Sequence, residues 1–136
     1  MTRFPADGAW TDSLWVAAQQ ALHDLVATLP PSAWLEIDLA AARVHQGLLA
    51  SGDRFVSKTS ESQALQRELP EALAVEMECA AIAQVCHDYG VPLAAVRTIS
   101  DRADDAAHVD FPRFIQTIAS RYSAAVLDRL LSRLPV

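Results

Sequence analysis

The chain has 136 residues, and its 51% hydrophobic content is ample for one domain with a buried core. A net charge of -6 and a pI near 5.0 argue against a nucleic-acid-binding protein, because the 11 lysines and arginines are scattered rather than clustered. No apolar run approaches the roughly 20 residues of a membrane span and the amino terminus does not resemble a signal peptide, so we expect a cytoplasmic protein.

The first third of the chain predicts one helix and an ambiguous stretch. Residues 1–10 lack periodicity and are expected to form an incoming connection. From about Asp12 to Thr28, apolar residues recur every three or four positions, which predicts an amphipathic helix capped by Thr11 or Asp12. Two prolines end this helix, and residues 32–42 fit a short helix and irregular chain equally well.

The next elements alternate between strand and helix. A predicted buried strand at residues 44–50 ends in the polar turn Ser51-Gly52-Asp53-Arg54. Glycine in such a turn lets the backbone approach a ligand closely, although an ordinary strand-ending turn is the simpler explanation. Ser60 and Gln63 match a capping box, which predicts a helix from there to about Leu69.

The stretch from residue 74 to residue 104 carries the most distinctive chemistry. A short strand at 73–75 stops at Glu76-Met77-Glu78, a helix runs to Tyr89-Gly90, and an apolar strand at 93–99 ends in Ser100-Asp101. Ligands bind beyond the carboxyl ends of the strands in an open parallel sheet. We therefore expect the acidic groups of both strand ends to face one crevice.

The chain closes with a polar loop and a long helix. Residues 101–110 are too polar for an element interior and are expected to lie over the crevice mouth. Asp110 then caps an amphipathic helix that starts at Phe111. The alternation predicts one α/β domain over residues 1–136. Its three layers are helix, sheet and helix (αβα), and the sheet is mostly parallel or mixed. Three strands make this sheet thin, which indicates an incomplete fold.

The two cysteines do not indicate a disulfide or a metal site. Cys79 and Cys86 lie seven residues apart on one predicted helix, which is too far for a disulfide, and no second cysteine or histidine pair has metal-binding spacing. We expect buried free thiols.

Three charged side chains near the strand ends suggest a binding site. Glu78 begins a helix, where the helix dipole favours its charge, and its carboxylate can accept hydrogen bonds from a vicinal diol such as ribose. Asp101 can act as a general acid if burial and the nearby glutamates favour its protonated form. Arg97 lies in an apolar run and must find a partner. An ion pair between Arg97 and one of the glutamates explains that residue without any function.

Two motifs together carry a family resemblance. The run AVEMECAAIAQVC, followed by VPLAAVRTISDRAD, resembles the signature of the nucleoside phosphorylase and hydrolase superfamily. The likeness is strongest to the bacterial 5′-methylthioadenosine/S-adenosylhomocysteine nucleosidases, and the upstream GLLASGDRF segment agrees with it. It covers about residues 45–134. The resemblance implies a phosphorylase-like fold, hydrolysis of an N-glycosidic bond to release adenine, no cofactor and a homodimer.

The resemblance also implies roles in base and sugar recognition. Phe55 matches the aromatic residue that stacks on adenine, and Val56 matches the residue whose backbone reads the purine edge. Met77 resembles the residue that packs against the ribose, and Glu78 the carboxylate that holds the ribose hydroxyls. Glu76 occupies a family position with a supporting role in substrate binding.

The remaining implied roles concern the reaction itself. Ser100 and Asp101 resemble the pair that meets N7 of the base, with Asp101 as the proton donor. Arg97 is similar to the family arginine near the attacking water, and Phe111 to a residue lining the alkylthio pocket. An aspartate at the purine contact suits a 6-amino base. The resemblance implies an asparagine at this position in the branch of the superfamily that prefers 6-oxopurines.

The length of the chain departs from the family pattern. Family members are about twice as long, and their amino-terminal half supplies a Gly-rich turn and the glutamate that activates water. We therefore expect a carboxyl-terminal half, which retains base and ribose recognition and the leaving-group acid. A nucleoside phosphorylase or a related nucleoside hydrolase is the enzymatic alternative. A non-catalytic domain that binds adenine nucleosides or a partner chain is the alternative of another class.

Overall fold

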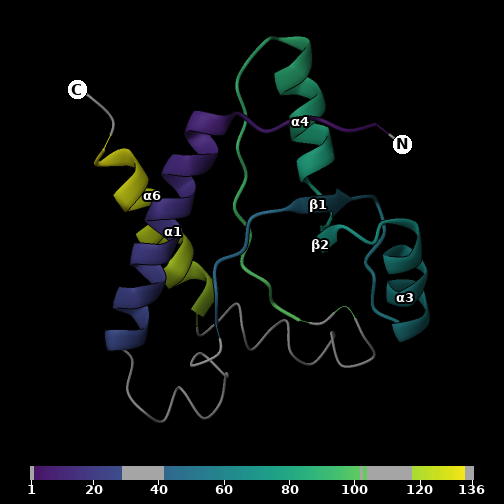
Figure 1. The fold of residues 1–136 in the computed structure, drawn as a ribbon, viewed down its shortest axis with the longest axis horizontal. Helices are drawn as coiled ribbons and strands as arrows, with labels where there is room; N and C mark the ends of the chain where they lie inside the picture. Colours follow the sequence, from purple (N-terminus) through teal and green to yellow (C-terminus); the bar gives the residue numbers. More distant parts are fainter. Residues whose placement is uncertain (1, 29–41, 102, 104–117, 134–136) are drawn as a thin grey trace.

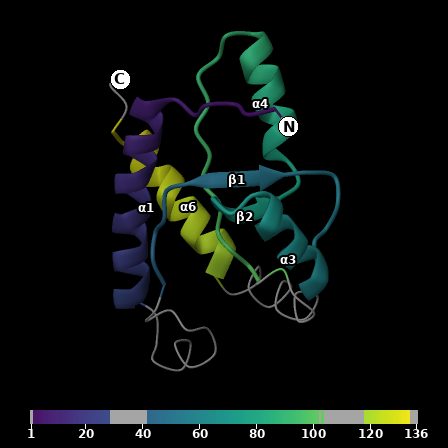
Figure 2. The ribbon, with the colours of Figure 1, turned by 45° about the vertical axis from the view of Figure 1, so that its right-hand side comes forward.

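The computed structural model describes residues 2–28, 42–101, 103 and 118–133. Along the chain the elements are α1 (Gly8–Thr28), β1 (Leu48–Ser51), α3 (Thr59–Glu68), β2 (Ala72–Glu76), α4 (Cys79–Asp88) and α6 (Ser120–Leu131). Figures 1 and 2 both show α1 and α6 side by side on one side of the strands, with α3 on the other. The predicted α/β class is confirmed.

The two strands form a small parallel sheet joined through α3. Their register pairs Leu49 with Ala74 and Ser51 with Glu76, after an irregularity at Leu48. The Gly52 amide extends the pairing by donating to the Glu76 carbonyl at 3.1 Å. The carboxyl ends of β1 and β2 therefore lie next to each other.

The predicted strand at 93–99 is wrong, since residues 91–100 form no regular element. A strand requires a ladder of backbone hydrogen bonds with a neighbour. Among the described residues, such bonds reach this segment at two points, from the Asp7 amide to the Leu93 carbonyl and from the Val91 amide to the Cys86 carbonyl. In the described part of the chain the sheet therefore has two strands rather than three.

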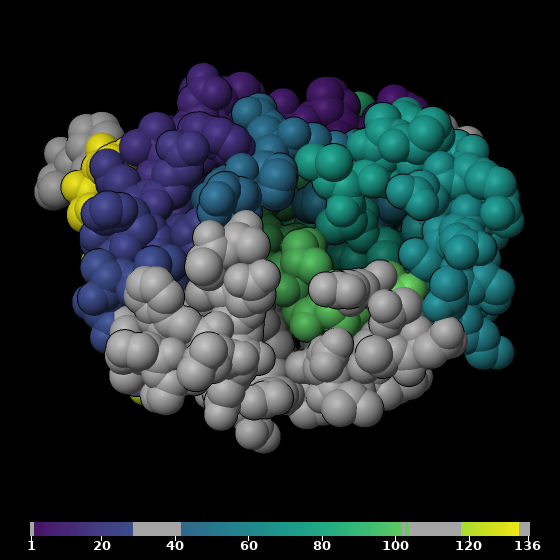
Figure 3. Space-filling view, turned by 60° about the horizontal axis from the view of Figure 1, so that its bottom comes forward, coloured from purple at the N-terminus to yellow at the C-terminus, as the bar shows by residue number. Residues whose placement is uncertain are grey.

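The segment at 91–100 nevertheless has a defined path. It passes between α4 and the pair formed by α1 and α6 (Figure 1), and residues 93–97 line hollows on both sides. In the space-filling view it is visible, in green, between the blue and teal parts of the molecule (Figure 3). Arg97, Ser100 and Asp101 all come from this segment.

Helix α1 starts four residues earlier than predicted, and a different residue caps it. The Asp7 side chain accepts a hydrogen bond from the Trp10 amide at 2.9 Å, and the Asp7 carbonyl accepts one from the Thr11 amide at 3.0 Å. The predicted caps, Thr11 and Asp12, lie inside the helix. An aspartate before the first turn is a preferred cap, and the absence of apolar periodicity in that turn hid it.

The other helices follow the predictions more closely. Helix α3 occupies the predicted range, but Lys58 precedes it and no side chain caps it, so the capping box of Ser60 does not form. Helix α4 ends at Tyr89-Gly90 as predicted, with Gly90 at φ 65°. The predicted start of the last helix, including Asp110 and Phe111, lies outside the described residues.

The core lies where α1 meets α6. Its buried side chains are Leu14, Ala17, Ala18, Ala21, Val126 and Leu130. The alanines let the two helices approach closely, and the Tyr122 hydroxyl donates to the Ala18 carbonyl of α1 at 3.0 Å. An ion pair between Arg129 and Asp24 ties the same helices at the surface. None of the helices in the described ranges combines the length and the hydrophobicity that a membrane span requires.

Candidate active site

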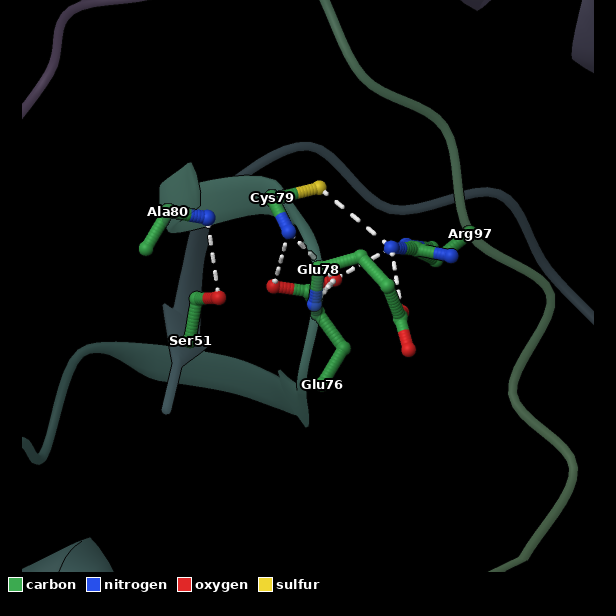
Figure 4. A network of polar contacts seen from close by, with 6 residues as sticks. All are labelled: Ser51, Glu76, Glu78, Cys79, Ala80 and Arg97. Carbon is green, nitrogen blue, oxygen red and sulfur yellow. Dashed lines mark hydrogen bonds and ion pairs between the residues drawn. The ribbon is translucent and has the colours of Figure 1, made fainter. Parts of the chain in front are cut away.

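The site is built where β1 and β2 end and α4 begins (Figure 4). Ser51 is the last residue of β1, and its hydroxyl oxygen accepts a hydrogen bond from the Ala80 amide at 2.9 Å. Its partner in the strand register, Glu76, is the last residue of β2. Both strands thus hold the first turn of the same helix.

The Glu76 carboxylate caps that turn. It accepts hydrogen bonds from the Glu78 amide at 3.1 Å and from the Cys79 amide at 2.9 and 3.0 Å. Burial by itself raises the pKa of Glu76, but hydrogen bonds from the Ser51 hydroxyl and from the Cys79 and Glu78 amides outweigh it and lower the pKa to about 2. Glu76 is therefore ionised at neutral pH.

Arg97 joins both glutamates (Figure 4). Its guanidinium forms ion pairs with Glu76 and with Glu78, the latter at 2.8 Å, and donates to the Cys79 sulfur at 3.6 Å. The predicted ion pair between Arg97 and a glutamate is confirmed, with two carboxylates instead of one. The side chain of Arg97 is 33% exposed, and its charge is compensated within this network.

Glu78 differs from Glu76 in its exposure. Its side chain is 62% exposed, compared with 10% for Glu76. Arg97 contacts Oε2 of Glu78, and no described residue hydrogen-bonds to Oε1. An exposed carboxylate oxygen in a fixed position can accept hydrogen bonds from a ligand hydroxyl.

Both cysteines are free thiols, half-buried rather than fully buried. Burial and the neighbouring Glu76 raise the pKa of the Cys79 thiol. Its proximity to Arg97 therefore does not make it a reactive thiolate. The described residues contain no group of acidic, histidine or cysteine side chains that could hold a metal ion.

Ser100 and Asp101 form a second polar group at the end of the segment that carries Arg97. The Ser100 hydroxyl donates to Asp101 Oδ2 at 2.7 Å, and the Ala103 amide donates to Asp101 Oδ1 at 2.8 Å. Ala103 has a φ of 53°, which places a sharp turn after the aspartate. The hydrogen bonds of Asp101 are made within its own loop, whereas those of the two glutamates are made with the start of α4 and with Arg97, so the structure links only part of the predicted crevice into one network.

The predicted contacts to the base come from neighbouring loops. Phe55 follows β1 and is 43% exposed, while Val56 is half-buried. Met77 lies between the two glutamates and is also 43% exposed. An aromatic side chain at this position can stack on a planar ring. Phe111 lies outside the described residues.

Sequence reasoning missed the role of Ser51. It treated this serine as part of a turn, whereas the structure shows it holding the Ala80 amide. A small polar residue at a strand end was the available signal. An apolar hollow of about 250 Å³ beside the network was also not predicted, and it is lined by Cys79, Ile82, Leu93, Ala94, Ala95, Val96 and Arg97.

Comparison with known proteins gives a consistent result. A family model described as the phosphorylase superfamily matches residues 2–132. The 5′-methylthioadenosine/S-adenosylhomocysteine nucleosidase from Neisseria meningitidis, solved with methylthio-immucillin-A, is 34% identical with a TM-score of 0.73. The match covers 96% of this chain and 48% of that one.

Two further solved structures are similar over comparable spans. The S-adenosylhomocysteine nucleosidase from Streptococcus pyogenes, in complex with 5-methylthiotubericidin, is 31% identical with a TM-score of 0.73, over 98% of this chain and 48% of that one. The futalosine hydrolase of Helicobacter pylori is 28% identical with a TM-score of 0.68, over 96% and 47%. The chain thus spans about half the length of these structures, and the fold is incomplete relative to them. With a family model matching residues 2–132, the chain belongs to the phosphorylase superfamily.

Proposed function

We propose that this chain supplies the base- and ribose-binding part of a nucleosidase that hydrolyses 5′-methylthioadenosine or S-adenosylhomocysteine to release adenine. The observation that carries the proposal is the exposed Glu78 carboxylate, held at the start of α4 by Arg97. A fixed carboxylate of this kind suits a ribose diol. The similarity to nucleosidases solved with nucleoside analogues supports the same ligand class.

The proposed roles follow the chemistry of N-glycosidic cleavage. The sugar gains positive charge and the departing base gains negative charge, so a proton donor at N7 accelerates the reaction. We assign that proton to Asp101, positioned by Ser100. Phe55 stacks on adenine, Val56 reads its edge through the backbone, and Met77 packs against the sugar.

The proposed roles for the 5′ substituent and for the attacking water involve other residues. Phe111 lines the pocket for the 5′ substituent, and Arg97 lies near the attacking water. Because the chain spans about half of its structural relatives, we assign water activation to a glutamate outside this chain. We propose that the completed enzyme is a cytoplasmic homodimer.

The test uses Asp101→Asn in the completed domain, made either as a longer reading frame or by mixing this chain with the remaining half. Adenine release from 5′-methylthioadenosine is expected to fall by about 10²–10⁴-fold, because the amide cannot supply the proton. Asp128→Asn on α6 is the matched control. Unchanged adenine release in Asp101→Asn would show that another group is the proton donor.

The same assay separates the enzymatic alternatives. A requirement for inorganic phosphate would identify a phosphorylase instead of a hydrolase. Futalosine is the second substrate to include, because a futalosine hydrolase is among the structural relatives. The higher identity to the adenine-releasing nucleosidases favours methylthioadenosine.

A binding function without catalysis is the second candidate. It is favoured by the span of the chain, which retains the exposed Glu78 and the adjoining hollow but covers about half of its relatives. Calorimetry of the 136-residue chain with adenosine tests it. Micromolar binding without adenine release supports a binding domain, and the absence of binding contradicts it.

A further inference from the structure

The two glutamates around Met77 occupy different surroundings, and this difference assigns them different tasks. We propose that Glu76 is a positioning residue, which clamps the first turn of α4 and Arg97 so that Glu78 alone presents a carboxylate to a ribose diol. This inference rests on the proposed function for the identity of the ligand. It replaces the substrate-binding role that the sequence suggests for Glu76.

The first argument is that protein donors occupy the Glu76 carboxylate. A carboxylate offers about four acceptor sites. Its Oε2 faces the Glu78 amide, the Cys79 amide and Arg97, while Oε1 also faces the Cys79 amide. With its side chain 10% exposed, little of this group can reach a ligand.

The second argument concerns the start of α4. The first amides of a helix have no partners within the helix and often bind anionic ligands. Here Glu76 takes the amides of Glu78 and Cys79, and Ser51 takes that of Ala80. Side chains from both strand ends therefore hold this turn, and these three amides are not available to a substrate.

The third argument concerns charge. Arg97 lies between two carboxylates and pairs with both of them. If Glu76 were neutral, Arg97 would attract Glu78 alone and compete with a ligand hydroxyl for its oxygens. Because Glu76 is negatively charged, the Arg97 guanidinium is shared between the two carboxylates. Glu78 therefore keeps acceptor capacity for a ligand hydroxyl.

The first measurement does not depend on any ligand. The amide proton shifts of Glu78 and Cys79 are followed by NMR from pH 6 to pH 2 in the unchanged chain and in Glu76→Gln. In the unchanged chain both shifts should move as the pH falls from 4 to 2, the end of the titration, and in Glu76→Gln this movement should disappear. Glu71→Gln is the matched control, because Glu71 precedes β2 and pairs with a different arginine, Arg3. If neither amide moves below pH 4 in the unchanged chain, the clamp does not exist.

The second measurement compares adenosine, 2′-deoxyadenosine and adenine by calorimetry. Glu76→Gln should weaken adenosine binding about tenfold and leave adenine binding unchanged, since an amide in place of the clamp misplaces the group that holds the ribose hydroxyls. Unchanged adenine binding also shows that the variant is folded. Glu71→Gln should bind all three as the unchanged chain does.

A double variant distinguishes positioning from direct contact. If Glu76 acts through Glu78, Glu76→Gln adds no further loss of adenosine affinity in a Glu78→Gln background. Additive losses, or an unchanged preference for adenosine in Glu76→Gln, overturn the inference while the proposed ligand class stands. If the unchanged chain binds no nucleoside, the proposed function fails for this chain, and the NMR titration decides on the clamp.

Discussion

At the scale of single residues, Glu76 makes the clearest prediction about pH and stability. Its pKa is about 2 in the folded chain, compared with an ordinary value of 4.5. A lowered pKa means that its stabilising contribution is fully present above pH 4.5 and is lost as the pH falls from there towards 2. Glu76→Gln should therefore lower the free energy of unfolding at pH 7 by about 2 kcal/mol.

Urea denaturation at several pH values between 7 and 2.5 measures this contribution. The difference between the unchanged chain and Glu76→Gln should shrink as the pH falls below 4.5. Glu71→Gln serves again as the control, because Glu71 and Arg3 form their ion pair at the surface. A difference that is independent of pH would contradict the assignment of the lowered pKa to Glu76.

At the scale of elements, the end of α4 depends on one glycine. Gly90 has a φ of 65°, which is costly for residues with a Cβ, and a Cβ there would meet nothing within 4 Å. Gly90→Ala should therefore destabilise the chain by about 1 kcal/mol through the backbone alone. Thermal unfolding measures the effect.

Gly8 provides a matched comparison for that substitution. It begins α1 without a positive φ, and a Cβ there would also meet nothing within 4 Å. Gly8→Ala should leave the melting temperature unchanged or raise it, because alanine restricts the unfolded chain more than glycine does. Equal losses at both positions would show that backbone conformation is not the cause.

The elements also show how far sequence reasoning reaches. Apolar periodicity located most of α1, whose Leu14 and Ala18 are buried, because such a pattern records which face of a helix is buried. It failed at residues 93–99, because an apolar run does not show whether a neighbouring strand pairs with the segment. Helix caps failed for α1 and α3 because several polar residues near each start were equally plausible.

Part of the candidate site was predictable from the order of residues along the chain. Glu76 and Glu78 follow a strand directly, so their place at its end could be inferred from the chain alone. The ion pair of Arg97 followed from the cost of an unpaired charge in an apolar run. The contact from Ser51 to Ala80 depends on the register of β1 with β2, which the sequence does not specify.

At the scale of the whole molecule, the hollow beside the site exposes apolar side chains. Ile82 of α4 and Val96 both line it and are 51% and 39% exposed. Contiguous exposed apolar surface usually favours association. We expect the chain to self-associate at high concentration, and Ile82→Lys should weaken this association.

Sedimentation velocity over a range of concentrations provides the measurement. Leu131→Lys is the control, because Leu131 is 61% exposed but lies at the end of α6 and does not line the hollow. If both variants weaken association equally, general surface charge is responsible and the hollow has no special part in it.

The hydrogen bond from Tyr122 to Ala18 makes the junction of α1 and α6 optically observable. Burial raises the pKa of Tyr122 above its ordinary value of 10.0, so this tyrosine stabilises the fold in its neutral form and ceases to do so as the pH rises past its folded-state pKa. Tyr89→Phe leaves Tyr122 as the sole tyrosine of the chain. The ultraviolet absorbance of its phenolate should then appear in the same alkaline range in which the helical circular dichroism falls, so that one chromophore reports the separation of the two helices.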